Sequence, residues 1–423
     1  MTRKKGRAER GQSDESDESD ESDEEEKAER SEAPKKASRS EAPKKASRSE
    51  APKKASRSEA RKKEASRGKN NKKREVDSLQ NMTDESWRRL ARETGCLELG
   101  CLTPELLCPG QLDNLLSAWQ SRGNAGALDY IDARRDILAA PFASRPWARA
   151  ALLISFAPRP DPDSPIRRLP PARPGFPAAL VAPYALNEDY HVTGARILER
   201  LSQRLTELAP GGAPPQFEPC TDSRPVMEKQ LALLAGLGSQ GLNSLIRNDT
   251  HGCRLHLAVL FTSLPLEPRL LSGHTPAVAC QDCRRCLTQC PTGAFAPGNF
   301  QVRRCRAWLA SEYRRPLSRD QRRLLGDTLF GCGRCTLSCP AQPTDSQELR
   351  PYAADAWLLA TMPSGELTRL IRGSILQRTG ATLLKRNAVA AIANQTPPDQ
   401  WPEARDRLLA ATSSPTVIDT LNA

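Results

Sequence analysis

The chain has 423 residues, enough for two or three domains, and carries a formal net charge of +12 at pH 7. Hydrophobic residues make up 38% and aromatic residues 4%, and no apolar run is long enough to cross a bilayer, so we expect a cytoplasmic protein without a membrane partner. In that reducing compartment the clustered members of its 13 cysteines are expected to bind metal rather than to form disulfides.

The first 80 residues differ in composition from the rest. An acidic run at 13–26 precedes three copies of "SEAPKKASR" at 31–57 and one altered copy. Such a tract has almost no large apolar side chains to offset the entropy cost of ordering, so residues 1–80 are predicted to be a disordered polyampholyte tail. These residues hold 24 Lys or Arg and 19 Asp or Glu, which leaves +7 of the net charge for the remainder. That excess fits a polyanionic partner such as RNA, or a plain solvated surface.

Helical and apolar segments alternate in the next part of the chain. Helices are expected at 83–95, where Thr83 can be the N-cap, at 110–123 and at 186–208. Two short apolar runs, at 148–158 and 255–266, are expected to be buried strands. This alternation predicts an α/β domain over residues 81–272.

A cysteine-rich segment and a helical segment complete the chain. Residues 273–350 hold the clustered cysteines and are predicted to form a ferredoxin-like domain. Residues 351–423 contain the helical stretches "ELTRLIRGSI", "ATLLKRNAVAAIANQ" and "PPDQWPEARDRLLAATS". These predict a C-terminal tail of stacked, HEAT-like helix pairs.

The run "CQDCRRCLTQCP" has the spacing C-x2-C-x2-C-x3-C-P, which is the bacterial ferredoxin run for a [4Fe–4S] cluster. A partner run, "CGRCTLSCP", is one cysteine short, and Cys305 is the only other cysteine between the two runs. In two-cluster proteins the fourth cysteine of a run binds the other cluster. The predicted ligand sets are therefore Cys280, Cys283, Cys286 and Cys339 for one cluster, and Cys290, Cys305, Cys332 and Cys335 for the other.

Two zinc knuckles are the alternative for these cysteines, because C-x2-C pairs also bind zinc. Zinc knuckles do not require a third cysteine at the same spacing or two Cys-Pro pairs, which favours the clusters. The remaining five cysteines are expected to be small buried hydrophobic residues; these are Cys96, Cys101, Cys108, Cys220 and Cys253.

With this cysteine pattern in view, the sequence resembles the epoxyqueuosine reductases. The resemblance covers most of residues 83–395 and includes the separated cysteine at 305. Its pieces, in chain order, are "LDYIDARRD" (128–136), "VAPYALNEDYH" (181–191), "TDSRPVMEKQLALLAGLGSQGLNSLI" (221–246), "FTSLPLEP" (261–268) and "RGSILQRTGATLLKRNAVAAIAN" (372–394).

The resemblance implies a cobalamin-dependent enzyme with two [4Fe–4S] clusters that reduces epoxyqueuosine to queuosine in tRNA. Electrons would pass from an external low-potential donor through a cluster to cobalamin, and we expect a monomer. The proton donor proposed for the family lies in a "DS-x-P-V" segment, here "DSRPV", so that role carries over to Asp222, with Ser223 beside it at the cofactor. From the residues alone, Asp222 could equally cap a helix over "RPVMEKQLALLAG".

A glycine-rich stretch follows that helix. Its glycines, with two polar neighbours, are expected to let the backbone approach the cofactor; the residues are Gly236, Gly238, Gly241, Asn243 and Ser244. The letters also fit the dinucleotide fingerprint G-x-G-x-x-G, but a helix rather than a strand precedes them. Ser239 and Leu242 stand where the family has Trp and Lys, which raises the question of an altered substrate or cofactor contact.

The segment "DYHVTG" at 189–194 matches the D-x-H-x-x-G signature of other cobalamin proteins, in which the His binds cobalt. Here it falls in a predicted helix rather than in a strand-to-helix loop, so we expect His191 to be a core or hydrogen-bonded residue instead.

Two other functions stay open at this point. One is a dehalogenase-like cobalamin and iron–sulfur reductase with a small-molecule substrate. The other is a non-enzymatic electron carrier, although a carrier needs only the ferredoxin part and not the long α/β domain before it.

Overall fold

The computed structural model describes residues 79–248, 251–270, 280–296, 299–340 and 350–423. The predicted disordered tail lies outside these residues except for its last two positions. In the part of the chain that is described, no helix combines the length and the apolar character needed to span a membrane.

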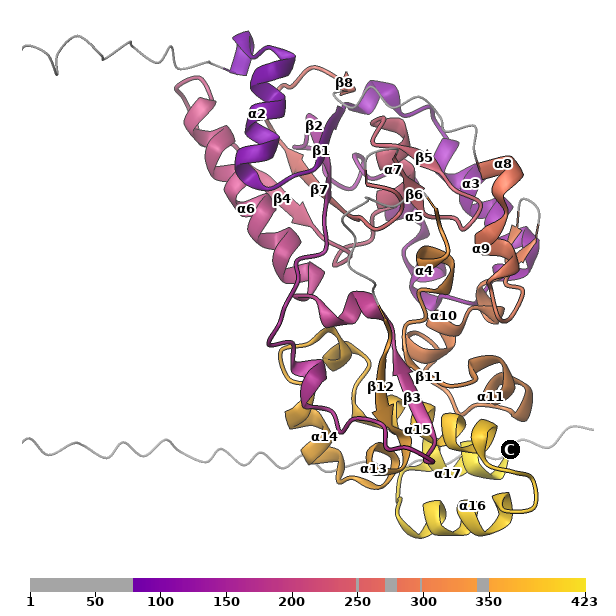
Figure 1. Cartoon of the computed structure of the whole chain (residues 1–423). Coiled ribbons are helices and arrows are strands. Elements are labelled where there is room, and N and C mark those ends of the chain that lie inside the picture. Colours follow the sequence, from indigo (N-terminus) through magenta and orange to yellow (C-terminus); the bar gives the residue numbers. More distant parts are fainter. Residues whose placement is uncertain (1–78, 249–250, 271–279, 297–298, 341–349) are drawn as a thin grey trace, which may run out of the picture. The chain divides into compact units, whose positions relative to one another are not determined.

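A five-stranded sheet carries the first half of the fold (Figure 1). Its strand order is β4-β7-β2-β1-β8, and every neighbouring pair is antiparallel. The strands are β1 (Glu98–Leu102), β2 (Ala150–Phe156), β4 (Phe217–Cys220), β7 (His256–Thr262) and β8 (Arg269–Leu270). The two predicted strands are thus confirmed as β2 and β7.

The pairing differs from the parallel sheet that alternating helices and strands usually form. Leu102 at the end of β1 lies opposite Ala151 at the start of β2. The helices between these two strands therefore return the chain to the same end of the sheet instead of crossing over it. The domain is α/β only in the sense that helices cover the sheet.

Helices cover both faces of this sheet. Successive residues of a strand point to opposite faces, so Leu152 and Ile154 pack against α2 and α6, while Ala151 and Leu153 pack against α7. All of β2 is buried as a result. The three helices are α2 (Asp84–Thr94), α6 (Tyr190–Leu208) and α7 (Glu228–Leu234).

The predicted N-cap of the first long helix is confirmed. The Thr83 hydroxyl accepts a hydrogen bond from the Ser86 backbone N–H at 3.2 Å, which satisfies one donor of the first turn. The predicted helix at 186–208 forms as α6, and the one at 110–123 forms as α3 (Gln111–Trp119) followed by a π-helical turn at Gln120–Asn124.

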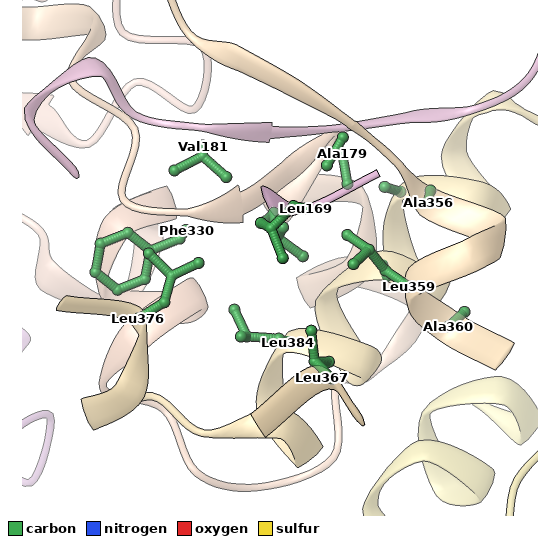
Figure 2. Close-up of a cluster of buried hydrophobic side chains, with 14 of the residues drawn as sticks. Leu169, Ala179, Val181, Phe330, Ala356, Leu359, Ala360, Leu367, Leu376 and Leu384 are labelled. Atoms are coloured by element: carbon green, nitrogen blue, oxygen red, sulfur yellow. The ribbon is translucent and has the colours of Figure 1, made fainter. Parts of the chain in front are cut away.

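A second sheet joins three distant segments of the chain. Strand β3 (Ala178–Val181) pairs in parallel with β11 (Thr328–Phe330) and antiparallel with β12 (Tyr352–Asp355). Figure 2 shows the core beneath it, in which Val181 and Phe330 face side chains of the C-terminal helices such as Leu384. The domain boundaries expected at 272 and 350 stay predictions, and strands from either side of both meet in this sheet.

The C-terminal helices surround a central helix, α15 (Ala381–Gln395). It contacts two strands of the second sheet and the helices α11 (Arg319–Leu325), α13 (Ala356–Thr361), α14 (Ser364–Leu370), α16 (Trp401–Ala410) and α17 (Pro415–Asn422). Arg386 and Asn387 of this helix are fully buried and donate to the backbone carbonyls of Leu309, Ala310 and Leu329. The predicted helices are confirmed, and they converge on one shared helix; their HEAT-like pairing stays a prediction.

The remaining elements are short. The helices are α4 (Asp129–Ala133), α5 (Arg135–Ala139), α8 (Cys280–Cys283), α9 (Arg285–Thr288), α10 (Arg306–Ser311), α11 (Arg319–Leu325), α12 (Arg334–Leu337), α13 (Ala356–Thr361), α14 (Ser364–Leu370), α16 (Trp401–Ala410) and α17 (Pro415–Asn422). Two hairpins pair β5 (Ser239–Gln240) with β6 (Ile246–Arg247) and β9 (Phe295–Ala296) with β10 (Asn299–Phe300).

Candidate active site

Four cysteines line one pocket of the structure. They come from the loops around α8 and α9 and from the end of the second cysteine run; they are Cys280, Cys283, Cys286 and Cys339. Burial, followed by the charges of Cys280 and Cys339, raises the pKa of the Cys286 thiol. Two loops that are distant in sequence thus place these four thiols around one volume.

The other four clustered cysteines also lie within electrostatic reach of one another. Burial, followed by the charges of Cys305, Cys332 and Cys290, raises the pKa of Cys335 to about 12. Burial likewise raises the pKa of Cys305, and the charges of Cys332 and Cys290 add to it. These neighbours are consistent with the two predicted ligand sets, which we call the first set (280, 283, 286, 339) and the second set (290, 305, 332, 335).

The isolated Cys305 joins the second set because of the helix that follows it. Cys305 is the N-cap residue of α10, and the backbone N–H groups of Ala307 and Trp308 point at its thiol. A helix N-terminus stabilises a negative charge, which suits a thiolate ligand. Cys290 is held similarly, since its Sγ accepts from the Ala294 N–H at 3.3 Å.

A ninth cysteine, Cys253, contacts the first set. Its buried thiol is hydrogen-bonded to the thiol of Cys339, and Asn243 Nδ2 donates to Cys253 Sγ at 3.7 Å and to the Cys335 carbonyl at 3.5 Å. The hydrogen bond to Cys339, followed by burial, raises the pKa of Cys253. Cys253 is buried, as expected, but its spacing from the other cysteines does not indicate this contact.

The glycine-rich stretch lies against the first set. Gly241, Leu242 and Asn243 line the same pocket as its four cysteines. A side chain at Gly238 would come within 2.4 Å of the Arg247 carbonyl oxygen, so close packing of β6 explains that glycine. Leu242, one of the two departures from the family pattern, therefore lies by the cysteines.

Gly236 and Ser244 both have positive φ angles, 69° and 61°, and bound the turns at either end of this stretch. The Ser244 carbonyl accepts from Lys229 Nζ at 3.5 Å. Ser239, the other departure, lies in β5 opposite Arg247.

Asp222 lies in the loop between β4 and α7. Helix α7 begins at Glu228 with Met227 as its N-cap, so the alternative role of Asp222 as the cap of this helix is wrong. The loop is held locally, because the Thr221 N–H donates to Ser223 Oγ at 3.3 Å and the Asp222 N–H donates to the Glu228 carboxylate. Asp222 has a φ of 49°, a left-handed conformation that Asp tolerates better than most residues.

Several ionisable groups lie within electrostatic range of the Asp222 side chain, which is itself 67% exposed; we call these groups the Asp222 ring. The Asp222 charge acts on Tyr130, Tyr184, Tyr190, Glu228, Lys229 and Glu312, which come from separate elements. Tyr190 donates its hydroxyl hydrogen to Asp222 Oδ2 at 2.5 Å. Desolvation, followed by the Asp222 charge, raises the pKa of Tyr190.

Two carboxyls of the ring are shifted toward their neutral forms. Burial raises the pKa of Glu228 to about 7, and the Asp222 charge adds to this against two backbone hydrogen bonds. Oxygen Oε1 of Glu228 is buried and has no hydrogen-bond partner among the described residues. Burial also raises the pKa of Glu312. A cluster of acids with raised pKa values is a common feature of proton-transfer sites.

Tyr184 connects the ring with the second cysteine set. Burial raises its pKa, and the charges of Glu312, Asp222 and Cys305 follow as further causes. Its ring also packs directly over Gly331, where a side chain would meet Tyr184 Cε1 at 2.9 Å. The polar ring and the cysteines of the second set are therefore neighbours.

His191 lies in the first turn of α6, near Asp222. Its Nδ1 is 2.7 Å from Asp189 Oδ1, which confirms the expectation of a hydrogen-bonded residue. Four of the five cysteines outside the sets are buried, as expected, but Cys108 is exposed, because it lies in the surface turn between β1 and α3.

A family profile described as a 4Fe-4S double cluster binding domain matches residues 279–342. A curated epoxyqueuosine reductase of Pseudomonas aeruginosa is 31% identical over 72% of this chain and 83% of its own length. The chain belongs to the epoxyqueuosine reductase family.

A second relative, the epoxyqueuosine reductase of Xanthomonas campestris pv. campestris, is 32% identical over 73% of this chain and 85% of its own length. Because these relatives are reductases, the chain is an enzyme and not only an electron carrier.

Solved structures of epoxyqueuosine reductases share the fold. The Streptococcus thermophilus enzyme matches with a TM-score of 0.63 and 22% identity, over 79% of this chain and 87% of its own. An epoxyqueuosine reductase bound to an epoxyqueuosine-modified tRNA-Tyr stem loop matches with a TM-score of 0.64, also at 22% identity, over 79% and 86% of the two chains. A Bacillus subtilis structure, in which the catalytic aspartate loop is swung out of the active site, matches with a TM-score of 0.63 and 22% identity. The match covers 80% of this chain and 88% of its own.

Proposed function

We propose that this chain reduces epoxyqueuosine to queuosine in tRNA. The observation that carries the proposal is the adjacency of the second cysteine set and the Asp222 ring, which Tyr184 joins. Electron-transfer ligands and proton donors must both reach one substrate, because removing an epoxide oxygen as water consumes two electrons and two protons. The epoxyqueuosine-modified stem loop bound to a relative of the same fold supports this substrate class.

Each cysteine set would hold one [4Fe–4S] cluster. The thiols fit this role: all are free, each set comes from two or more loops, and helix N-terminal N–H groups face Cys305. Bound clusters would supply electrons one at a time. The protein's part is to hold the thiols and to keep the second set beside the ring.

Cobalamin is the remaining cofactor implied by the family, and it would be bound next to the ring. Cobalamin would supply the reductant that acts directly on the epoxide. The ring fits such a group because the Asp222 side chain is 67% exposed and so can reach a bound molecule, while the Tyr190 hydroxyl holds its Oδ2. Gly241 and Asn243 instead border the cysteine pocket, so we assign them to the cluster side.

Asp222 would deliver a proton to the oxygen that leaves the epoxide. Tyr190 donates to its Oδ2, which would stabilise the carboxylate left after transfer. Ser223 and Glu228 hold the loop that carries it. A catalytic loop that carries an aspartate in the Bacillus subtilis structure supports this assignment.

The proposal also includes the cellular setting predicted from the sequence. A tRNA would be the substrate-bearing partner, an external low-potential protein would supply electrons, and the reaction would take place in the cytoplasm on a monomer. The C-terminal segment, predicted to be HEAT-like, would be fixed to the cluster region through the buried Arg386.

The test is conversion of epoxyqueuosine in an isolated tRNA stem loop. Anaerobically reconstituted protein, cobalamin and a chemical reductant are incubated with the stem loop, and nucleosides are measured by mass spectrometry. We expect queuosine to form only when clusters and cobalamin are both present. No conversion by a protein with full iron content and bound cobalamin would contradict the proposed substrate, and halogenated aromatic compounds would then test the dehalogenase-like alternative.

A further inference from the structure

One cluster ligand lies open to solvent. Of the eight clustered cysteines, all of which belong to the described residues, Cys283 alone is exposed and the other seven are half-buried. Cys283 ends α8 and belongs to the first set, whose four thiols line one pocket. The second set instead adjoins the Asp222 ring through Tyr184. The first set is therefore the side of the cluster region that an external electron donor can approach.

Basic side chains lie beside this exposed ligand. Arg284 and Arg285 follow it directly in the chain, and both are exposed. Arg284 also lines the pocket of the first set, as does the buried Arg247. Among the described residues no acidic side chain lines that pocket, and Asp282 is the one acidic residue of segment 280–296. The described side chains thus give this face a positive charge.

The excess positive charge of the folded part is concentrated in the cysteine-bearing segments. Residues 280–296 and 299–340 hold eleven arginines and four acidic residues, a net charge of +7. All residues after position 80 together carry the same net charge, so those outside these two segments are balanced. A concentrated positive field attracts an anionic partner and raises its rate of association.

The backbone at Arg284 is unusual for an arginine. Its φ of 47° lies in the left-handed region, which glycine or asparagine adopts at lower cost. The residue is the N-cap of α9 and stands between Cys283 and Cys286. Its side chain is exposed, so packing in the core does not explain an arginine there. Residues in such sparsely populated conformations are frequent at functional sites.

We propose that the face formed by Cys283, Arg284 and Arg285 is the docking site of an acidic, low-potential electron-carrier protein. This inference rests on the proposed placement of one cluster on each cysteine set. In each encounter the carrier loses one electron and the cluster of the first set gains it. Two encounters supply the two electrons that removal of the epoxide oxygen consumes. Electron-transfer partners meet through small, short-lived interfaces, so a few charged residues around one exposed ligand suffice.

RNA is the other anionic macromolecule that a basic face can attract. The modified base must reach the Asp222 ring, which adjoins the second set rather than the first. A separate group of arginines, at positions 319, 322 and 323, lies on α11, away from α8 and α9 (Figure 1). The exposed ligand therefore favours a protein donor at Arg284 and Arg285, and RNA binding there is an outcome of the test.

The first measurement is the rate at which a carrier reduces the oxidised, cluster-loaded protein. Photoreduced flavodoxin, an acidic low-potential carrier, is mixed with it anaerobically, and flavin absorbance is followed by stopped flow. At low ionic strength Arg284→Glu/Arg285→Glu should be roughly 10–100-fold slower than wild type, within the usual range of electrostatic steering. In about 1 M salt the Debye length is about 3 Å, so the two rates should agree within about twofold.

Two controls separate docking from other effects of charge. Arg319→Glu/Arg323→Glu on α11 changes the net charge by the same amount and should stay within about threefold of wild type at every salt concentration. Photoreduced deazaflavin, a small donor, should reduce all variants at the wild-type rate, and their iron contents should be equal. Where the charge reversal disturbs the clusters, the neutral variant Arg284→Gln/Arg285→Gln should show the same salt-dependent slowing to a smaller extent.

Three outcomes would overturn the docking site. Equal slowing by the α11 variant would make total charge the cause. A difference that persists in 1 M salt would place the effect in the cluster rather than in the encounter. A wild-type rate at low salt would remove the face from electron transfer, and weaker binding of the tRNA stem loop by the same variant would then assign it to RNA. No substrate is present in these measurements, so failure of the wild-type protein to form queuosine would overturn the proposed function alone.

Discussion

The cysteine sets and the Asp222 ring are neighbours, but they differ in how their members are brought together. Seven of the eight cysteines come from two short runs, whose loops fix their relative positions. The ring takes Tyr130 from α4, Tyr190 from α6, Glu228 from α7 and Glu312 from the end of α10, so only packing assembles it. The electron-transfer part is therefore local in sequence, and the proton-transfer part is not.

Chemistry explains this difference. A cluster needs four thiolates at fixed distances, and a loop with cysteines three residues apart supplies three of them from one piece of backbone. A proton donor needs an environment that shifts its charge state, and that environment consists of neighbours from any part of the chain. Substitutions in the two regions should accordingly have different consequences.

Loss of the second set's isolated ligand should have the largest effect. In Cys305→Ser we expect iron content to fall from about eight to about four atoms per chain, because the first set has no ligand there. Iron analysis and electron paramagnetic resonance of the reduced protein measure this. The exposed Cys108→Ser is the control and should keep the full content. Loss of both clusters would show that the two sets are not independent.

The acid of the ring comes next. Asp222→Asn keeps the size of the side chain but removes the transferable proton, so turnover should fall roughly 10²–10⁴-fold. Iron content and the thermal unfolding temperature should stay unchanged, since Asp222 is not a helix cap. Near-wild-type turnover in this variant would remove Asp222 from the proposed mechanism.

Glu228 tests the ring through its pH dependence. Its pKa is raised to about 7 in the folded protein, so between about pH 4.5 and 7 the unfolded chain releases a proton that the folded chain keeps. Wild-type stability should fall through that window as pH rises and level off above it.

In Glu228→Gln this loss should be absent. The variant should match wild type near pH 4 and exceed it by about 2–3 kcal/mol at pH 8, as measured by urea unfolding. The exposed Glu199→Gln on α6 should follow the wild-type curve. If the free energy of unfolding of Glu228→Gln differed from wild type by the same amount at every pH, burial of the Glu228 charge would not be the cause of the difference.

The smallest effect should come from Cys253. Its thiol is hydrogen-bonded to Cys339, and a hydrogen bond to a ligand sulfur stabilises the reduced cluster. Cys253→Ala should keep the iron content but lower the potential of one cluster by roughly tens of millivolts. A redox titration followed by electron paramagnetic resonance measures the shift. Loss of iron instead would make Cys253 a structural requirement of the first set.

Part of this protein follows from the sequence alone. The spacing of the cysteine runs determines the ligand loops, and the Thr83 cap and the apolar runs of β2 and β7 determine where elements form. These features depend on residues a few positions apart, whose relative geometry the backbone fixes. The "DSRPV" segment and the family resemblance also located Asp222, although not its surroundings.

Only the tertiary structure decided the rest. The antiparallel order β4-β7-β2-β1-β8, the sheet joining β3, β11 and β12, and the contact of His191 with Asp222 all join residues far apart in the chain. Tyr130 and Tyr190 lie within family-like pieces, but nothing in those pieces shows that they meet at Asp222. The pattern of residues around Glu228 does not indicate its burial, since a carboxylate in an amphipathic helix usually faces water. Its raised pKa arises from burial, and burial is a property of how the surfaces of separate elements pack rather than of any local pattern.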